Sequence, residues 1–158
     1  MKINIRYESE KDFRKVEEIT REAFYNLYVP RCEEHFLIHK IREHEDYIKE
    51  LSYVIEVDGE IIGSIFYTRS KIIGNNGVEM ETITFEPVSI HPKYHRKGFG
   101  KKLITYSIEK AKKLVYKAII TLGYPYHYEY LGFLGGKKYN ISMEDRKFYK
   151  GLLVLPLF

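Results

Sequence analysis

The sequence contains no tryptophan and a single cysteine, Cys32, among its 158 residues. One cysteine cannot form an internal disulfide, so a reducing compartment is the simplest expectation. The sequence has no apolar run long enough to span a membrane, no secretory signal pattern, no internal repeat and no interdomain linker. We therefore expect a cytoplasmic protein that forms a single domain over residues 1–158 and does not act at a membrane.

Neither sign of charge dominates the chain. The formal net charge is +4, and the most unusual feature of the composition is its 15 tyrosines. A mild positive charge suits attraction of an anionic ligand and does not by itself require nucleic acid. The tyrosines are compatible with a cleft that has polar-tipped aromatic walls, and equally with half-buried surface positions.

Periodicity of the apolar residues predicts an alternation of strands and helices. A capping box of Ser9 and Asp12 is expected to open a helix that Pro30 ends or restarts. Further helices are expected over 32–44 and over 99–115, the latter with a core face that includes Leu114 and Val115. Strands are expected over 2–7, 51–57, 60–70, 80–90, 118–122, 136–141 and 148–155, with turns at 58–59 and 74–77. The apolar C-terminal stretch 152–158 is expected to pack against the sheet or a partner, which leaves room for a homodimer.

The rest of the chain is organised around residues 88–103. An apolar segment runs into a short basic loop that contains Gly98 and Gly100, and an amphipathic segment runs out of it. Strand, glycine loop and helix N-terminus together predict an anion site. Lys101 and Lys102 fall in the first helical turn, where the helix dipole disfavours cations, and a bound polyanion would remove that conflict. The spacing matches neither a nucleotide triphosphatase loop nor a dinucleotide-binding fingerprint.

Pro87 interrupts the strand that leads into this loop. Proline cannot donate a hydrogen bond to a neighbouring strand, so pairing is expected to fail locally on one side. A main-chain group left unpaired there would be available to a ligand.

These motifs resemble the acetyl-CoA-binding region of the GNAT superfamily of N-acetyltransferases. The family core, Gln/Arg-x-x-Gly-x-Gly/Ala, corresponds to His95, Gly98 and Gly100, with histidine in place of the family's glutamine or arginine. The family's later tyrosine, four residues before a Gly-Phe pair, corresponds to Tyr128 before Gly132 and Phe133. The Gly-x-Pro at Gly123–Pro125 is similar to that of small bacterial acetyltransferases. The resemblance implies an α/β (α+β) fold, in which helices flank a mixed, mostly antiparallel sheet that contains a βαβ cofactor-binding unit.

The resemblance also implies which groups hold acetyl-CoA. The main chain of Val88 and Ile90 would pair with the pantetheine arm, and an N–H near Val88 would polarise the thioester carbonyl. The amine would attack directly, without a covalent enzyme intermediate, and Tyr128 would protonate the departing thiolate. The expected cofactor-binding residues are Val88, Ser89, Ile90, His95, Arg96, Lys97, Gly98, Phe99, Gly100 and Lys101.

The general base is less constrained by the sequence. If side chains alternate along the strand, Thr82, Thr84 and Glu86 share one face, and Glu86 stands next to the break at Pro87. Glu86 is therefore the first candidate to take the proton of the incoming amine. Glu81, His127 and a chain of water molecules remain alternatives.

Other chemistries have weaker support in the sequence. His35 and His39 have a spacing that suits a metal, but no third ligand accompanies them, so no metal is expected. Cys32 suits packing better than nucleophilic chemistry. Two rival functions are a catalytically silent acyl-CoA sensor or interaction module, which His95 permits, and a nucleic-acid-binding module based on the lysines. We expect no nucleic-acid partner, because the lysines accompany no recognition-helix pattern and no interleaved stacking aromatics. The acceptor could be a small amine, an amino acid, an antibiotic or a protein N-terminus.

Overall fold

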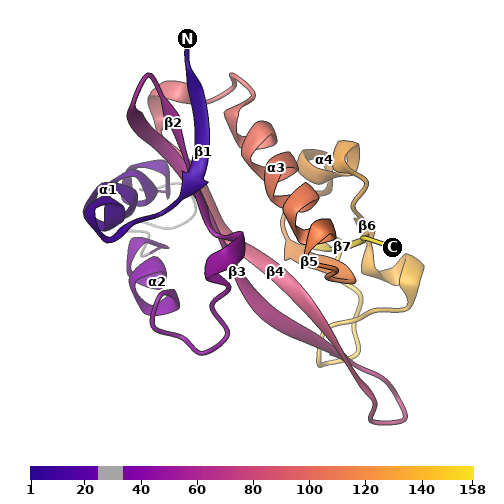
Figure 1. Ribbon diagram of the computed structural model, residues 1–158. Helices are drawn as coiled ribbons and strands as arrows, with labels where there is room; N and C mark the ends of the chain where they lie inside the picture. The colour runs from indigo at the N-terminus through magenta and orange to yellow at the C-terminus, as the bar shows by residue number, and fades with distance from the viewer. Residues whose placement is uncertain (25–33) are drawn as a thin grey trace. The chain divides into compact units, whose positions relative to one another are not determined.

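The computed structural model describes residues 1–24 and 34–158, and the side chains of Phe24 and residues 34–37 are not described. Figure 1 shows helices and strands in the order that the sequence predicts. The strands are β1 (Ile3–Tyr7), β2 (Tyr53–Val57), β3 (Glu60–Ile73), β4 (Glu79–Ile90), β5 (Ala118–Leu122), β6 (Leu134–Gly135) and β7 (Leu152–Pro156). The α-helices are α1 (Phe13–Phe24), α2 (Glu34–Ile41), α3 (Phe99–Lys113) and α4 (Pro125–Tyr128). In the described ranges, no helix is both long and apolar enough to cross a membrane.

The seven strands form one mixed sheet in the order β1-β2-β3-β4-β5-β7-β6. β1 and β2, β2 and β3, β5 and β7, and β6 and β7 pair antiparallel, whereas β4 and β5 pair parallel. This arrangement confirms the predicted fold class, including the parallel pair that a βαβ unit requires. The parallel register joins Ile83 to Ile119 and Thr84 to Ile120, a few residues before Pro87.

The chain forms two compact units. The first contains Met1–Thr68 and Glu86–Lys110, and the second contains Arg69–Phe85 and Ala111–Phe158. Strands β3 and β4 each contribute residues to both units. The single domain expected from the sequence stays a prediction, and each unit is described by itself below.

In the first unit, α1 and α2 lie side by side and cover an apolar core (Figure 1). Buried Val16 on α1 and Ile38 and Ile41 on α2 pack with Val54 and Phe66 of the strands. The predicted capping box is present. The Asp12 carboxylate accepts the hydrogen bond from the Ser9 N–H that the box requires, at 2.9 Å, and it also binds the Ser9 hydroxyl at 3.0 Å. It precedes a short 3₁₀ turn that leads into α1.

A buried ion pair ties the residue that follows α2 to the segment before α1. The Arg42 guanidinium binds the Glu8 carboxylate at 2.7 Å, and the two side chains are 7% and 4% exposed. Arg42 also lies 4.0 Å from the centre of the Phe13 ring. Burial raises the pKa of Glu8, although the hydrogen bond from Arg42 opposes the shift.

A glycine allows β3 and β4 to approach closely in the first unit. An ideal Cβ atom at Gly63 would stand 2.5 Å from Ile90 Cδ1 and 2.6 Å from the Ser89 carbonyl oxygen. Neither distance is compatible with a side chain, so any residue larger than glycine would push β4 away. The strand that leads into the predicted anion loop is thereby held directly against β3.

Helix α3 confirms most of its predicted core face. Phe99, Leu103, Ile104, Ile108 and Ala111 are all buried. The prediction was wrong for Leu114 and Val115, which are 50% and 70% exposed. The helix ends at Lys113, and Val115 has a φ of 64°, so these two residues leave the helical spacing that would have turned them inward.

In the second unit, the C-terminal strand β7 lies between β5 and β6. Its buried residues Leu152, Leu153 and Val154 confirm that the apolar end of the chain packs in the sheet. The strand expected over 136–141 was wrong, because a 3₁₀ helix occupies Gly136–Tyr139 and β6 is only two residues long. The Gly136 carbonyl accepts a hydrogen bond from the Ile141 N–H at 2.9 Å, which closes a tight loop.

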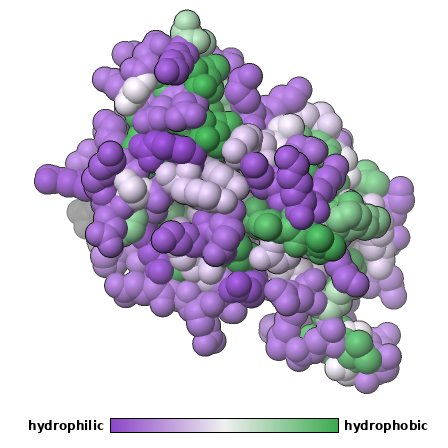
Figure 2. Space-filling view, in the orientation of Figure 1, coloured by the Kyte–Doolittle hydropathy of each residue, from purple (hydrophilic) through white to green (hydrophobic). Residues whose placement is uncertain are grey.

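The second unit also contains the outer part of the β3–β4 hairpin. Ion pairs join Arg69 to Glu81 and Lys71 to Glu79 across the two strands. Figure 2 shows hydrophobic surface at the hairpin tip, where Ile73 and Val78 are 62% and 63% exposed. The tip is the predicted turn, closed by a hydrogen bond from the Gly77 N–H to the Gly74 carbonyl at 2.9 Å.

Candidate functional site

The predicted anion loop lies in the first unit, between the end of β4 and the start of α3. A short 3₁₀ helix, Pro92–Tyr94, is followed by Arg96 and Gly98, whose φ angles of 61° and 83° turn the chain back into α3. In the described part of the chain, no heavy atom beyond its sequence neighbours comes within 4 Å of an ideal Cβ at Gly98. The space over this glycine is therefore open to a ligand, and its positive φ disfavours any larger residue.

The first turn of α3 supplies donors to this open space. The N–H groups of the first helical residues have no carbonyl partner within a helix, and the helix dipole makes this end positive. No acidic residue lies in the first turn, and Arg96, Lys97 and Lys101 around it are exposed. Gly98, Lys101 and Lys102 border a groove of about 820 Å³ that β1 and the next turn of α3 complete. This environment suits a polyanion with an extended body.

His95 fastens the loop to the strand before it. Its Nε2 lies 2.6 Å from the Ile90 carbonyl oxygen, and since a carbonyl can only accept, the imidazole donates this hydrogen bond. The contact spans the five residues from the end of β4 to the middle of the loop. Histidine at this position therefore supplies a donor to the main chain, as a glutamine or arginine side chain could.

His91 makes a second link that sequence analysis missed. Its Nδ1 accepts a hydrogen bond from the Lys93 N–H at 3.1 Å, and its Nε2 lies 2.7 Å from the Glu22 carboxylate on α1. The same imidazole thus caps the 3₁₀ helix and joins the start of the loop to α1. The local His-Pro pair is a cap signal, but nothing in the sequence indicates that Glu22 is its partner.

The residues of β4 expected to hold the cofactor differ in their surroundings. The Ser89 hydroxyl is buried and lies 2.9 Å from the Thr20 hydroxyl of α1. A contact of Ser89 with a cofactor would therefore have to come from its main chain. Val88 and Ile90 are partly exposed, and Ile90 lies near Gly100, with 3.7 Å between its Cγ1 and an ideal Cβ at that glycine.

The candidates for the general base are spread along the chain. Glu86 is exposed on β4 in the first unit, next to Pro87. The Thr82 and Thr84 hydroxyls, in the second unit, both bind the Ser70 hydroxyl, at 2.8 Å and 3.0 Å, and so share one face as predicted. Glu81 is paired with Arg69 at 3.7 Å. His127 is exposed and lies 4.1 Å from Tyr126 between ring centres.

Tyr128, the candidate general acid, belongs to the second unit at the end of α4. Its ring centre lies 5.9 Å from that of Phe85 and 5.8 Å from that of Phe133. These two partners are 2% and 0% exposed, whereas Tyr128 is partly exposed. The ring is thus anchored in the core while the residue reaches the surface. Because Tyr128 and Glu86 belong to different units, their predicted cooperation stays a prediction.

The weaker candidates fall partly outside the described residues. Cys32 and the side chain of His35 are among those not described. His39 is described, and its Nδ1 lies 3.3 Å from the Glu17 carboxylate of α1. Among the described residues, no three histidine, cysteine, aspartate or glutamate side chains gather as a metal site would require.

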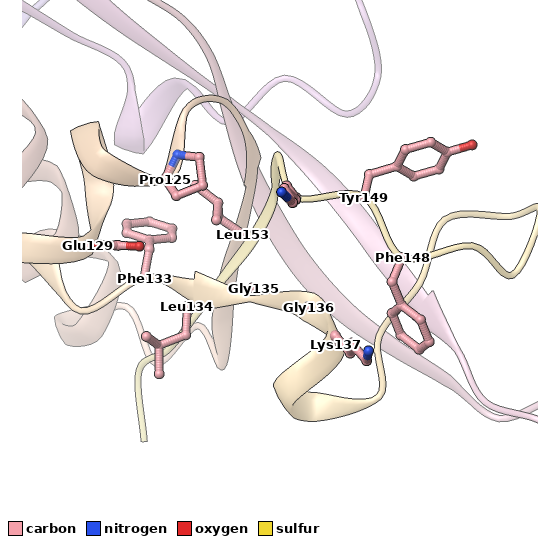
Figure 3. Close-up of a pocket in the computed structure, with 11 residues that line it drawn as sticks. Pro125, Glu129, Phe133, Leu134, Gly135, Gly136, Lys137, Phe148, Tyr149 and Leu153 are labelled. Atoms are coloured by element: carbon pink, nitrogen blue, oxygen red, sulfur yellow. The ribbon is translucent and has the colours of Figure 1, made fainter.

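A separate cavity of about 300 Å³ lies in the second unit (Figure 3). Pro125, Phe133 and Leu153 lie together on one side of it, and Phe148 and Lys137 on the other. None of the residues described at its wall belongs to the site that the sequence predicts.

The comparisons with known proteins agree with this geometry. The family model described as acetyltransferase (GNAT) family matches residues 21–133. The chain belongs to the GNAT acetyltransferase family. The match covers the anion loop and extends to Phe133, and it confirms the resemblance found from the motifs. GNAT enzymes depend on acetyl-CoA, which accords with a polyanion site at the loop.

Individual relatives are distant. The uncharacterized N-acetyltransferase YhbS of Escherichia coli K12 is 26% identical over 98 residues, which cover 61% of this chain and 56% of that protein. A Brucella melitensis GNAT acetyltransferase, solved with acetyl-CoA, has a TM-score of 0.75 and 26% identity, and the match covers 84% of this chain and 83% of that one. E. coli YhbS, solved with CoA, has a TM-score of 0.85 over 100% of this chain and 83% of its own, at 21% identity. The last similarity shows the GNAT fold.

Proposed function

We propose that this protein transfers an acetyl group from acetyl-CoA to a primary amine in a ternary complex. The observation that carries the proposal is the loop of residues 95–98, which enters α3 through positive φ angles at Arg96 and Gly98. Main-chain donors, four nearby basic side chains and open space over Gly98 suit the pyrophosphate of CoA. The solved structures of GNAT relatives with acetyl-CoA and with CoA support the same ligand.

The reaction would begin with loss of a proton from the acceptor. An alkyl ammonium has a pKa of about 10, so a base must remove its proton before attack at neutral pH. We assign this step to Glu86, an exposed carboxylate on the strand that leads into the loop. The free amine then attacks the thioester carbonyl, and a main-chain N–H near Val88 stabilises the oxyanion that forms.

Collapse of this intermediate completes the transfer. The carbon–sulfur bond breaks, the new carbon–nitrogen bond remains, and the CoA thiolate takes a proton from the Tyr128 hydroxyl. The nitrogen loses its remaining excess proton, which restores the Tyr128 hydroxyl through solvent, and Glu86 releases its own proton to solvent. The products are an N-acetylated amine and free CoA. The partly exposed position of Tyr128, with its ring held by buried aromatics, supports this role.

Two measurements test the proposal: calorimetric titration with acetyl-CoA, and release of thiol from acetyl-CoA in the presence of a panel of amines, amino acids and peptides. Arg96→Ala combined with Lys97→Ala should weaken acetyl-CoA binding, whereas Lys113→Ala at the far end of α3 should not. Binding without thiol release from any amine would favour the silent acyl-CoA sensor. Absence of acetyl-CoA binding, together with a salt-sensitive complex with short DNA or RNA, would favour the nucleic-acid reading instead.

A further inference from the structure

We propose that Gly123 is a positioning residue that seats the ring of Tyr128, with Gly151 fixing the main chain of Gly123 through a hydrogen bond. The inference rests on the proposed function, because it concerns the orientation of the group assigned as general acid. All of the residues involved belong to the second unit. The seat consists of main-chain atoms on one side and of two buried aromatic rings elsewhere around Tyr128.

The contact between Gly123 and Tyr128 leaves no room for a side chain. An ideal Cβ atom at position 123 would lie 2.7 Å from Tyr128 Cε2, 3.5 Å from Cδ2 and 3.6 Å from Cζ. Gly123 does not have a positive φ, so its φ does not require glycine. The glycine is therefore explained by the ring that lies on it and not by the turn.

The ring has little freedom to move away from such a contact. Phe85 and Phe133 are themselves packed edge to face, with 6.0 Å between ring centres, and both contact Tyr128. Rings this deeply buried cannot yield without disturbing the core. A methyl group at position 123 would have to displace the Tyr128 ring by about 1 Å to reach a normal carbon–carbon separation.

Gly151 holds the main chain of Gly123 in place. The Gly123 N–H donates a hydrogen bond to the Gly151 carbonyl at 2.9 Å, which continues the β5–β7 pairing one step beyond Leu122 and Leu152. An ideal Cβ atom at Gly151 would stand 3.1 Å from the Gly123 carbonyl oxygen. Two glycines just beyond the paired ends of β5 and β7 thus bring main chain against main chain, and the first of them contacts the tyrosine ring. The position of the Tyr128 ring is therefore limited by main-chain atoms that strand pairing holds in place.

The consequence for the reaction is geometric. Proton transfer to a leaving group requires hydrogen-bond distance, and misplacement of a catalytic group by about 1 Å can cost about 100-fold in rate. Substrate binding need not change, because Gly123 and Gly151 lie outside the loop that we assign to the pyrophosphate. Disruption of the contact between Gly123 and Tyr128 should therefore lower kcat and leave the KM for acetyl-CoA unchanged.

The test compares Gly123→Ala with Gly135→Ala, a matched control in the same unit that has no neighbouring atom within 4 Å of an ideal Cβ. We expect Gly123→Ala to lower kcat by about 10- to 100-fold, with the KM for acetyl-CoA changed less than about twofold. Gly135→Ala should leave both constants unchanged. In a Tyr128→Phe background, Gly123→Ala should add little further loss, because the hydroxyl that it misplaces is already absent. An equal loss in both backgrounds, or no loss in the single variant, overturns the proposal.

A double-mutant cycle on thermal stability tests the contact between Gly123 and Tyr128 independently of catalytic activity. Thermal unfolding should show a lower midpoint for Gly123→Ala than for the parent, and most of that decrease should vanish when Tyr128→Ala removes the ring. If no amine is acetylated but the effect of Gly123→Ala still depends on the Tyr128 ring, the proposed function is wrong and the contact between the two residues is supported. If the decrease is the same with and without the ring, the seat is wrong whatever the activity. Should Gly123→Ala fail to fold, successful folding of the double variant with Tyr128→Ala would support the seat, and failure of the double variant would contradict it.

Discussion

At the scale of single residues, His95 offers a direct test of how the loop is held. Its hydrogen bond to the Ile90 carbonyl joins loop and strand. We expect His95→Ala to weaken acetyl-CoA binding by about threefold to tenfold, the usual net value of one such bond. His95→Gln keeps a donor and should bind nearly as tightly as the parent. Titration calorimetry on the three proteins decides the point, and an unchanged dissociation constant for the alanine variant would contradict it.

Tyr128 carries the second prediction at this scale. Tyr128→Phe removes the proposed acid and keeps the ring that Phe85 and Phe133 contact. We expect kcat to fall by about 100-fold or more, with acetyl-CoA affinity and the thermal midpoint little changed. Steady-state kinetics and a melting curve on the same preparation check this. Undiminished turnover would remove Tyr128 from the acid role.

Glu86 carries the third. Glu86→Gln should lose rate near neutral pH and recover as the pH rises, because a growing fraction of the amine is then deprotonated without help. The measurement is a profile of kcat/KM for the amine against pH, with Glu79→Gln as the control carboxylate on the same strand. A profile identical to that of the parent would point to another base.

Some of these residues could be found from the sequence, and others could not. Local motifs identify Gly98, Gly100 and Tyr128. The two glycines belong to a loop between a strand and a helix, and the tyrosine stands at the family's spacing before a Gly-Phe pair. The Thr20–Ser89 and Glu22–His91 contacts join residues 69 positions apart in the chain. Nothing local to either partner indicates such a contact, since it depends on how α1 packs on the strands.

At the scale of secondary structure, the end of α3 differs from the periodicity of its residues. The Tyr116 N–H bonds the Ala111 carbonyl at 3.1 Å and the Val115 N–H bonds the Lys112 carbonyl at 3.0 Å, which is a Schellman ending. Such an ending places its last residue in the left-handed region, where glycine is usual. Here Val115 takes that position with a φ of 64°. Apolar spacing predicted Val115 as core, and the chain uses it as a cap.

This ending gives the fourth prediction. Val115→Gly should stabilise the protein by about 0.5–1 kcal/mol. The left-handed conformation costs a β-branched residue about 1–2 kcal/mol, and part of this gain is offset because glycine gives the unfolded chain more conformational freedom. Urea unfolding measures the difference. Leu114→Gly is the matched control, since Leu114 has no positive φ, and it should destabilise. A less stable Val115→Gly variant would contradict the argument.

Short elements were the least predictable part of the fold. The long segments β3, β4 and α3 as far as Lys113 follow strong periodicity, and the structure confirms them. It also confirms α1 as far as Phe24, whereas Pro30, at the predicted end of that helix, lies outside the described residues. The stretch 136–141 contains too few residues for a period to decide between strand and 3₁₀ helix. Its outcome depends on the contact of Gly136 with the Ile141 main chain, where an ideal Cβ would meet the carbonyl oxygen at 2.5 Å.

At the scale of the whole molecule, acid stability should depend on carboxylates whose pKa the fold lowers, and Asp12 is the one with the largest shift. Asp12 has a pKa lowered to about 2 by its hydrogen bonds from Arg6 and Ser9. The group therefore stabilises the folded protein above its unfolded pKa of about 3.9, and this contribution, about 2 kcal/mol, is lost as the pH falls from about 4 to about 2. Burial raises the pKa of Glu8, so protonation of Glu8 does not add to that loss.

The fifth prediction follows from this balance. Asp12→Asn should be less stable than the parent at neutral pH, and the difference should shrink below about pH 4. Unfolding curves at several pH values test this, with Glu10→Gln as an exposed control two residues away. A difference that stays constant down to pH 2 would show that the Arg6–Asp12 pair does not govern acid stability.

The division into two units has a consequence for how this chain can be dissected. The chain passes from one unit to the other after Thr68, after Phe85 and again after Lys110. No single cut, therefore, releases either unit as an uninterrupted fragment, and a chimera that exchanges one unit with a relative needs three junctions. Two of those junctions fall inside β3 and β4, where a seam would have to preserve strand register. A chimera that keeps both units intact therefore cannot take the anion loop from one parent and α4, with Tyr128, from the other through a single crossover.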